Sequence, residues 1–393
     1  MTDTIRTTID LGKMSPLARQ SIPAKLCTTR TPLGNVVEHY AKPNREKSPM
    51  SGTGMQWVAR CEADPRCPEL GPLPARIDMD VSVPNAVVGQ NVQHGTSVHA
   101  AGHSALELLR IMLASHGVPR HELDLLGVDD VSLRGVTVAF LMICADSAEA
   151  ERFIDMICVT GRVLVRGYER KESTNVTVTL PDREYTVQAY IKTLLEHCKW
   201  AAGAPVDDLL APMPCIVRVE SRLGERFLKA RKLTALADWK DAYADGVYES
   251  LFNETVRDVL RLEEGLRNRV PREEVYWRLS PIEEGVLRWY VGGHDPRAYP
   301  NIAGSKAPAK RFSAVACAIL KKAQVDINIP WMQHSQLHCR DLADILRYPG
   351  DYRPSATDAP WCFCEENWPS TRKEMRRKYD EVAASDLMRR TAR

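Results

Sequence analysis

The sequence predicts an α+β fold, an antiparallel sheet with flanking helices followed by a mainly helical C-terminal module. Two strand-like stretches, Val176–Leu180 and Thr186–Lys192, are separated by the turn-like tetrad Pro-Asp-Arg-Glu, which predicts a hairpin. A third stretch, Cys215–Leu223, alternates in the same way, whereas other segments have helical patterns. With 393 residues, 44% of them hydrophobic, the chain can form two or three globular domains.

The elements can be placed in order. Residues 1–75 are rich in proline and charge and predict loops with one or two strands, and residues 76–92 predict a strand pair. A helix is expected from about Ser104 to His116, because Gly117 follows as a stop signal. The apolar run Gly135–Cys144 predicts a buried strand. Asp146-Ser-Ala-Glu149 is typical of a capping box that begins a helix ending near Gly161.

The second half predicts more helix than strand. A helical stretch is expected from Tyr243 to Leu266, and a small helical module from 271 to 330. The remaining tail, 331–393, ends in a charged helix. We therefore expect three parts, divided as 1–265, 271–330 and 331–393.

Alternation along the hairpin strand Thr186–Lys192 predicts its chemistry. Val187, Ala189 and Ile191 form one apolar face, so Gln188, Tyr190 and Lys192 form the other. A phenol close to a cation suits attack on a phosphodiester, because the phenoxide is the nucleophile and the ammonium neutralises phosphate charge. The alternative is an ordinary half-exposed strand tyrosine.

The strand Cys215–Leu223 carries a second polar face, formed by Arg218, Glu220 and Arg222. Such a row is usually a solvated set of ion pairs. If the two strands share a sheet and their polar faces coincide, the tyrosine, the cations and the carboxylate form a surface suited to metal-assisted phosphoryl transfer.

Taken together, Val187–Lys192 and Val217–Leu223 resemble the replication initiators of filamentous phages, the gene II/gene X type proteins of phages and plasmids. Further similarity lies in the apolar segment Pro84–Val92, interpreted as a strand, in Leu287–Arg297, and in the opening Thr2–Arg6. The basic stretch 306–322 and Gln324-Val-Asp-Ile-Asn328 follow in the family's order. The match spans roughly residues 1–330.

The resemblance implies a rolling-circle initiator that nicks one strand at a phage origin and later rejoins it through a 5′-phosphotyrosine intermediate. It places the nucleophile at Tyr190, the following lysine at Lys192, and the Arg-x-Glu motif at Arg218 and Glu220. It also implies a ferredoxin-like sheet of the rolling-circle-nuclease type. The alternative function is a non-catalytic origin-binding replication factor.

The family's metal site implies Mg²⁺ or Mn²⁺ held by Glu220 and Gln90. Gln90 stands where the family has histidine in Gly-His-Asn, and the strand that begins near Arg134 lacks the family's carboxylate. An amide oxygen is a weak ligand for hard cations. His94, four residues further on, is the alternative ligand.

The net charge of +2 indicates that any DNA affinity comes from local patches. Expected DNA contacts are two arginines of the strand and four cations of the basic stretch: Arg218, Arg222, Lys310, Arg311, Lys321 and Lys322.

Expected partners are double- and single-stranded origin DNA, with a host helicase and DNA polymerase. No apolar run is long enough to cross a membrane, and the first thirty residues lack a signal-peptide pattern. Eleven scattered cysteines do not predict a disulfide framework, so the cytoplasm of a bacterial host is the expected location.

Overall fold

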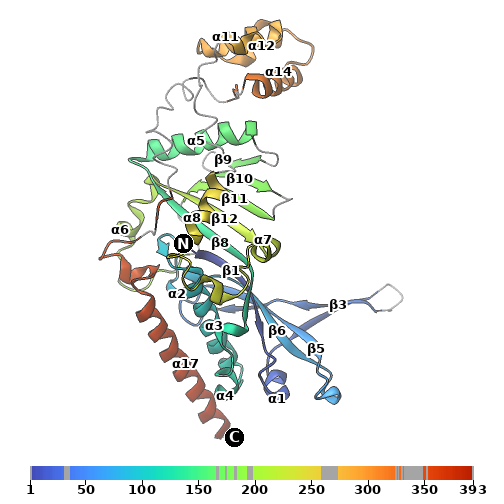
Figure 1. Cartoon of the computed structure of the whole chain (residues 1–393), viewed down its shortest axis with the longest axis vertical. Coiled ribbons are helices and arrows are strands. Elements are labelled where there is room, and N and C mark those ends of the chain that lie inside the picture. Colours follow the sequence, from blue (N-terminus) through green and yellow to red (C-terminus); the bar gives the residue numbers. More distant parts are fainter. Residues whose placement is uncertain are drawn as a thin grey trace.

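The structure is a computed structural model of the chain, and it describes residues 2–30, 36–164, 168–172, 175–180, 184–192, 198–257, 273–323, 325, 327–328, 331, 348–350 and 353–391. A nine-stranded sheet forms its centre, with the strand order β4-β5-β6-β1-β8-β12-β11-β10-β9 (Figure 1). Every neighbouring pair in this sheet is antiparallel. The predicted α+β class is confirmed. In sheet order the strands are Asn44–Lys47, Gly54–Ala63, Pro72–Ser82, Thr2–Asp10, Val131–Ile143, Ile216–Gly224, Tyr185–Ile191, Asn175–Leu180 and Tyr168–Glu172.

Strands β6 and β8 both pair with β1, so they are parallel to each other with β1 between them. They are connected through the helices α2 (Val83–Val88), α3 (Val98–Ser115) and α4 (Arg120–Leu123). This is a split βαβ unit. It places the loop between α2 and α3 at the end of β1, beside the start of the chain: the backbone N–H of Thr2 donates to the carbonyl of Thr96 at 2.9 Å.

The sheet has one apolar and one polar face. Alternate residues such as Ile5, Val138 and Val219 are fully buried in a single core. The same core contains side chains of α3, α5 (Ser147–Leu164), α7 (Glu225–Ala230) and α8 (Val247–Phe252). The opposite face carries charged and polar residues, which is the alternation expected of an antiparallel sheet with one covered face.

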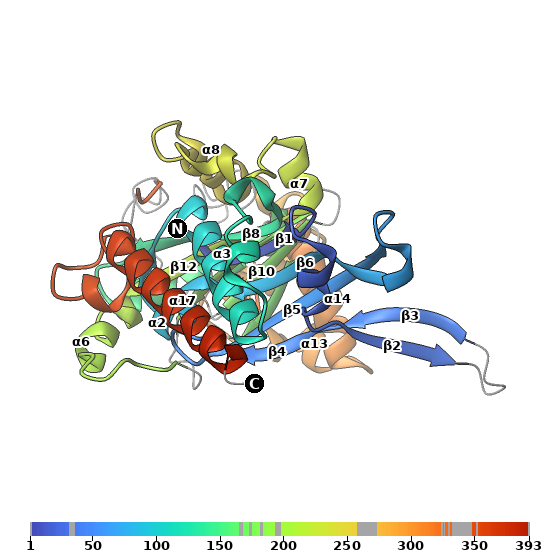
Figure 2. The ribbon, with the colours of Figure 1, turned by 90° about the horizontal axis from the view of Figure 1, so that it is seen from below.

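The C-terminal segment belongs to the same core. Helix α17 (Trp368–Thr391) lies along α3 in both views (Figures 1 and 2). Phe363, Met375 and Tyr379 are fully buried with the residues of the sheet domain. The described residues 348–350 and 353–391 therefore belong to a segment that packs on the first domain, whereas Trp331 packs against the core of the helical module.

A small helical module follows the sheet domain. Its helices are α11 (Glu273–Tyr276), α12 (Pro281–Val291), α13 (Pro300–Ala303) and α14 (Pro308–Ala323). They enclose a separate hydrophobic core that includes Val286, Leu287 and Ile319. Ser280 and Glu283 form a capping box at the start of α12. The predicted helical module is thus confirmed.

Several expected elements differ from the structure. The interpretation of 84–88 as strand is wrong: these residues form α2, with Pro84 in its first turn and Gly89 ending it at φ +84°. The described part of residues 1–75 contains five complete strands, β1 to β5, and the beginning of β6, not one or two strands. Helix α3 begins at Val98 because Ser97 caps it, and the helix predicted from Tyr243 begins at Val247, with 258–266 outside the described residues.

The remaining elements lie at the edges of the sheet domain: α1 (Pro16–Gln20), β2 (Lys25–Arg30), β3 (Val36–Lys42), β7 (His94–Gly95), α6 (Val206–Leu210) and β13 (Phe363–Cys364). Strands β2 and β3 form a two-stranded ribbon that projects from the body (Figure 2). Across the described ranges, we find no helix with the length and apolar character of a membrane span.

Candidate functional site

The predicted coincidence of the two polar strand faces is confirmed. Strands β11 and β12 are neighbours, with Gln188 opposite Glu220 and Tyr190 opposite Arg218. Directly paired residues in an antiparallel sheet point to the same side. Val187 and Ala189 are buried on the other side, as the alternation predicts.

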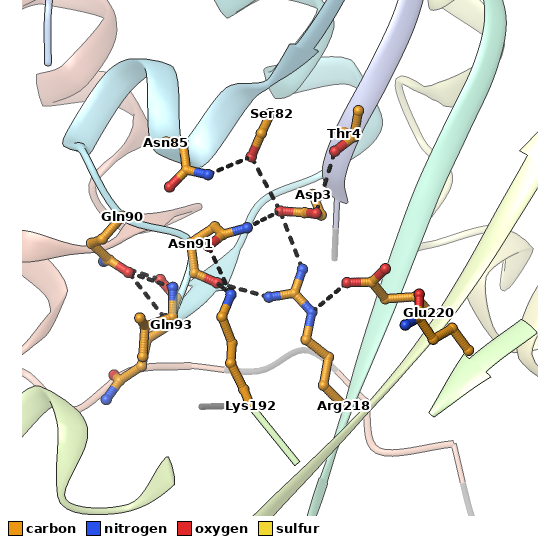
Figure 3. Close-up of polar contacts among 12 residues, drawn as sticks. Asp3, Thr4, Ser82, Asn85, Gln90, Asn91, Gln93, Lys192, Arg218 and Glu220 are labelled. Carbon is orange, nitrogen blue, oxygen red and sulfur yellow. Dashed lines mark hydrogen bonds and ion pairs between the residues drawn. The ribbon is translucent and has the colours of Figure 1, made fainter. Parts of the chain in front are cut away.

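Arg218 is the centre of a buried polar network (Figure 3). Its side chain has no exposed surface, and its guanidinium lies 2.9 Å from Glu220 Oε1 and 3.2 Å from Asp3 Oδ1. It also donates to the backbone carbonyl of Asn91 at 2.7 Å. Two carboxylates therefore compensate one buried cation, as a buried charge requires.

Asp3 reaches this network through an irregularity of β1. The pairing of β1 with β8 shifts register between Thr2 and Thr4. A bulge of this kind redirects a side chain, because it interrupts the strict alternation of the strand. The Asp3 carboxylate accepts from Asn91 Nδ2 at 2.9 Å and from Ser82 Oγ at 3.4 Å (Figure 3).

Tyr190 is half-buried, and its hydroxyl donates to Glu220 Oε1 at 2.7 Å. Burial raises the pKa of this phenol far above its usual value, and the charge of Glu220 adds to the rise while Arg218 opposes it. The phenol is therefore protonated at neutral pH. Glu220 is in position to receive the phenolic proton, which is the role of a general base.

Lys192 lies on the same side of the site and is 5% exposed. Its ammonium donates to the backbone carbonyl and to Oδ1 of Asn91. Burial, together with the nearby charge of Arg218, lowers the pKa of Lys192 to about 7. Its charge can therefore change near neutral pH, which the sequence alone did not indicate.

The loop that carries Asn91 is held by distant segments. Gly89 adopts φ +84°, and a Cβ there would lie 1.8 Å from the carbonyl oxygen of Lys199, so glycine is required. Lys199 N–H donates to the Gly89 carbonyl at 2.8 Å. On the other side, β13 pairs with β7, which follows the loop.

Gln90 fixes this loop instead of facing Glu220. Its Oε1 accepts from the backbone N–H groups of Val92 and Gln93, and its Nε2 donates to the carbonyl of Trp361 at 2.9 Å. Gln90 is 1% exposed. In Figure 3 it points toward Gln93, with Asn91, Lys192 and Arg218 between it and Glu220.

The predicted Mg²⁺ or Mn²⁺ ligands are therefore not brought together. The amide oxygen of Gln90 is occupied by backbone donors, and both oxygens of Glu220 are occupied by Tyr190, Arg218 and Arg222. Within the part of the chain that the structure describes, no three His, Cys, Asp or Glu side chains group as a metal would need. This donor set does not fit a divalent cation. The side chain of His94 lies outside the description.

A groove of about 520 Å³ opens beside the network on the polar face. Glu220 and Asp3 are among the residues that line it, so the network reaches the groove there. Arg222 stands at the rim with about half of its side chain exposed, and it contacts Gln188 Oε1 at 2.6 Å and Glu220 Oε2 at 3.2 Å. The predicted DNA contact at Arg222 is thus geometrically accessible, whereas Arg218 is not, because its guanidinium is enclosed by the network.

The other predicted DNA-contacting residues lie in the helical module. Lys310, Arg311, Lys321 and Lys322 project from the exposed side of α14. Lys322 makes an ion pair with Glu283 at 2.7 Å. The buried side of α14 carries Phe312, Ala316 and Ile319.

Sequence reasoning missed the roles of Asp3 and Asn91. Both lie in segments that contributed to the family resemblance, Thr2–Arg6 and Pro84–Val92, but neither stands out as a functional residue in its own segment. Comparison of the chain with protein-family models, with curated proteins and with solved structures gives no match.

Proposed function

We propose that this chain nicks and rejoins a DNA strand, with Tyr190 as the nucleophile. One observation carries the proposal: the Tyr190 hydroxyl donates at 2.7 Å to Glu220, which lines a groove on the polar face. A nucleophile hydrogen-bonded to a base that is itself oriented by a third group is the arrangement typical of covalent catalysis. Arg218 is that third group, at 2.9 Å from the same carboxylate oxygen.

The reaction follows from these positions. The Tyr190 oxygen forms a bond to phosphorus, and the bond from phosphorus to the 3′ oxygen breaks. The phenolic proton passes to Glu220, and the departing 3′ oxygen takes a proton from solvent. Rejoining is the reverse reaction, in which a 3′ hydroxyl displaces Tyr190 from the 5′ phosphate.

Charge on the phosphate needs compensation from the protein. Arg222 is the exposed cation next to Glu220, and a guanidinium binds phosphate oxygens through two parallel hydrogen bonds. Dependence on Mg²⁺ or Mn²⁺ stays a prediction, and no step above requires the metal. Origin duplex, helicase and polymerase likewise stay predicted partners.

The second candidate is a DNA-binding factor that does not cut. It is favoured by the contacts of Glu220, because both of its carboxylate oxygens already have partners. Glu220 accepts from Tyr190 and contacts two arginines. A carboxylate so strongly compensated is a weak base, and the raised pKa of Tyr190 opposes formation of the phenoxide.

A covalent-capture experiment separates the two candidates. The wild-type protein is incubated with a randomised pool of labelled single-stranded oligonucleotides, with Mg²⁺, with Mn²⁺, or with EDTA. A labelled protein band on a denaturing gel is expected from wild type and absent from Tyr190→Phe. Tyr185→Phe is the matched control, because Tyr185 is in the same strand but is buried on the opposite face.

Each outcome is informative. An adduct of normal yield in Tyr190→Phe would move the nucleophile to another residue. Binding of the pool without any adduct from wild type would favour the non-catalytic factor. An adduct in EDTA at the full rate would exclude the predicted metal dependence.

We further propose that α14 binds duplex DNA while the sheet domain cuts. Replacing Lys310, Arg311, Lys321 and Lys322 by alanine should weaken duplex binding. The slope of log K against log salt should become less steep by about 0.9 for each lost phosphate contact. Adduct formation with a short single strand should stay nearly unchanged. Equal loss in both assays would show that the two activities are not divided between the modules.

A further inference from the structure

Arg6 lies on the polar face at the point where two grooves meet. It is in β1, two strands away from β12, and it lines both the groove beside Glu220 and a second groove that continues toward β5. Each groove has a volume of about 520 Å³. Arg6 is level with Gly224 on β12, because Arg6 is opposite Gly135 and Gly135 is opposite Gly224. Glu220 is two strands across, at about 4.8 Å each, and four residues along, at about 3.4 Å each, so its backbone lies roughly 17 Å from that of Arg6.

Gly135 creates the space for the Arg6 side chain. It is the residue opposite Arg6 on β8, and a Cβ at this position would lie 2.4 to 2.7 Å from the Nη2, Nε and Cζ atoms of the guanidinium. The guanidinium therefore lies directly on the backbone of Gly135. A glycine inside a strand often marks a close approach by another group, and here the group is a cation.

The other three guanidiniums that line these two grooves, those of Arg60, Arg134 and Arg222, are already paired, as is the neighbouring Arg218. Arg218 contacts Asp3 and Glu220, and Arg222 contacts Gln188 and Glu220. The remaining two, Arg60 and Arg134, both contact the carboxylate of Asp78.

Arg6 is different. Within the described ranges of the chain, its guanidinium makes no hydrogen bond and no ion pair. Asp80 is its directly paired neighbour on β6, and only a longer-range attraction between the two charges is found. The planar set of N–H donors of the Arg6 guanidinium is thus available to a ligand in the grooves.

We propose that Arg6 binds a backbone phosphate of a single-stranded nucleic acid, farther along the same strand than the phosphate that reacts at Tyr190. The inference rests on the proposed function of the site. A guanidinium binds a phosphodiester with two parallel hydrogen bonds, whereas the carboxylates that line the same grooves repel it. An uncommitted cation is therefore required in a groove that contains Asp3, Asp80, Glu184 and Glu220.

Arg6 acts as a positioning residue in this arrangement. It holds the nucleic-acid strand at a point on β1, three strands across the sheet from the nucleophile on β11, so that the scissile phosphate is held against Tyr190. Gly135 has a role through Arg6 only, because it sets where the guanidinium lies and does not itself contact the strand.

The test uses full-length protein carrying Tyr190→Phe, so that binding is measured without cutting. Fluorescence anisotropy with a labelled single-stranded oligonucleotide gives the affinity and its salt dependence. Arg6→Gln should weaken binding by about tenfold or more, since hydrogen bonds to charged groups contribute that much. It should also flatten the slope of log K against log salt by about 0.7.

Two further variants separate geometry from charge. Gly135→Ala keeps the charge of Arg6 but displaces its guanidinium, so it should lose affinity to a similar extent. Lys240→Gln removes one exposed cation from the helical side of the sheet, near α3, and should change affinity less than twofold. Thermal unfolding of each variant establishes that the fold is retained.

The inference is overturned if Arg6→Gln binds the oligonucleotide as Lys240→Gln does. Displacement of the oligonucleotide by millimolar inorganic phosphate, but not by chloride at the same ionic strength, would also overturn it, because the site would then prefer a free anion to a strand. If the covalent adduct fails to form in wild type but Arg6→Gln still weakens binding, then the nicking proposal fails and the Arg6 site stands.

Discussion

The polar face of the sheet has a closed end and an open end, and the same residue types behave differently in each. At the closed end, Arg218 and Glu220 are 0% and 2% exposed and every charge has a partner. At the open end, Arg6 and Asp80 are exposed and are not in ion-pair contact. Burial forces charges to compensate each other, whereas exposed charges can be left available for a ligand.

The difference arises from what covers the sheet. The closed end is covered by the loop around Asn91, which is itself held by Lys199 and Trp361. Among the residues that the structure describes, the open end has no such cover, and it forms the grooves. Chain segments more than a hundred residues apart therefore decide which part of one sheet face is structural and which part can bind.

The largest expected loss of stability follows replacement of Arg218, at the centre of the closed end. Arg218→Met should reduce the free energy of unfolding by about 3 to 5 kcal/mol, because it leaves two buried carboxylates without their cation. Urea denaturation followed by tryptophan fluorescence measures the change. Arg222→Met is the matched control and should cost less than about 1 kcal/mol, since half of its side chain is in solvent. Equal costs for the two variants would contradict the division into closed and open ends.

Lys192 gives the closed end a pH dependence of defined sign. Burial lowers its pKa from 10.5 to about 7, so between these values the native protein has lost a proton that the unfolded chain keeps. Stability should therefore rise with pH through this window, with a slope of up to about 1.4 kcal/mol per pH unit. Below pH 7 both states carry the proton and the slope vanishes.

Chemical denaturation from pH 6 to pH 10 tests this prediction by subtraction. The difference in stability between wild type and Lys192→Met should increase with pH across the window. A difference that is constant, or that falls as pH rises, would show that Lys192 is fully charged in the native protein.

Sequence patterns predicted the two faces of these strands because alternation is a local property. The two faces of Thr186–Lys192 follow from period two, and so does the side on which Arg218 and Glu220 lie. Helix α2 was missed because its valines favour strand, yet Pro84 in the first turn and Gly89 after the last decide for helix.

The residues that contact Arg218 and Gln90 could not be predicted in the same way. Asp3 faces Arg218 through a register shift, which alternation does not show. Gln90 was assigned to a metal by resemblance, but its environment is decided by Trp361, 271 residues away. Long-range contacts of this kind leave no local pattern in the chain.

A substitution of Gln90 tests whether its long-range contacts, and not a metal, decide its role. Gln90→His should destabilise the protein by about 1 to 3 kcal/mol, because imidazole cannot replace an oxygen that accepts from two backbone N–H groups and a nitrogen that donates to Trp361. The family resemblance predicts the opposite, a gain of metal-dependent adduct formation. Thermal unfolding with and without Mn²⁺ distinguishes the two, since a restored metal ligand would make the melting temperature of the variant rise with Mn²⁺.

The smallest effect is expected at the open end. Asp80→Asn should change the free energy of unfolding by no more than about 0.5 kcal/mol at neutral pH, because the residue is exposed. The sign of the change is nevertheless defined. Partial burial raises the pKa of Asp80, so the native protein binds this proton more tightly than the unfolded chain and loses stability as pH rises from 3.8 through the raised pKa.

Removing this carboxyl should therefore stabilise slightly at pH 7 and not at pH 3. The same substitution removes a negative charge beside Arg6, so oligonucleotide binding should strengthen while stability barely moves. Such a separation of binding from stability is what an open end predicts. A loss of stability comparable to that of Arg218→Met would show that Asp80 belongs to a buried network and that the polar face is closed along its whole length.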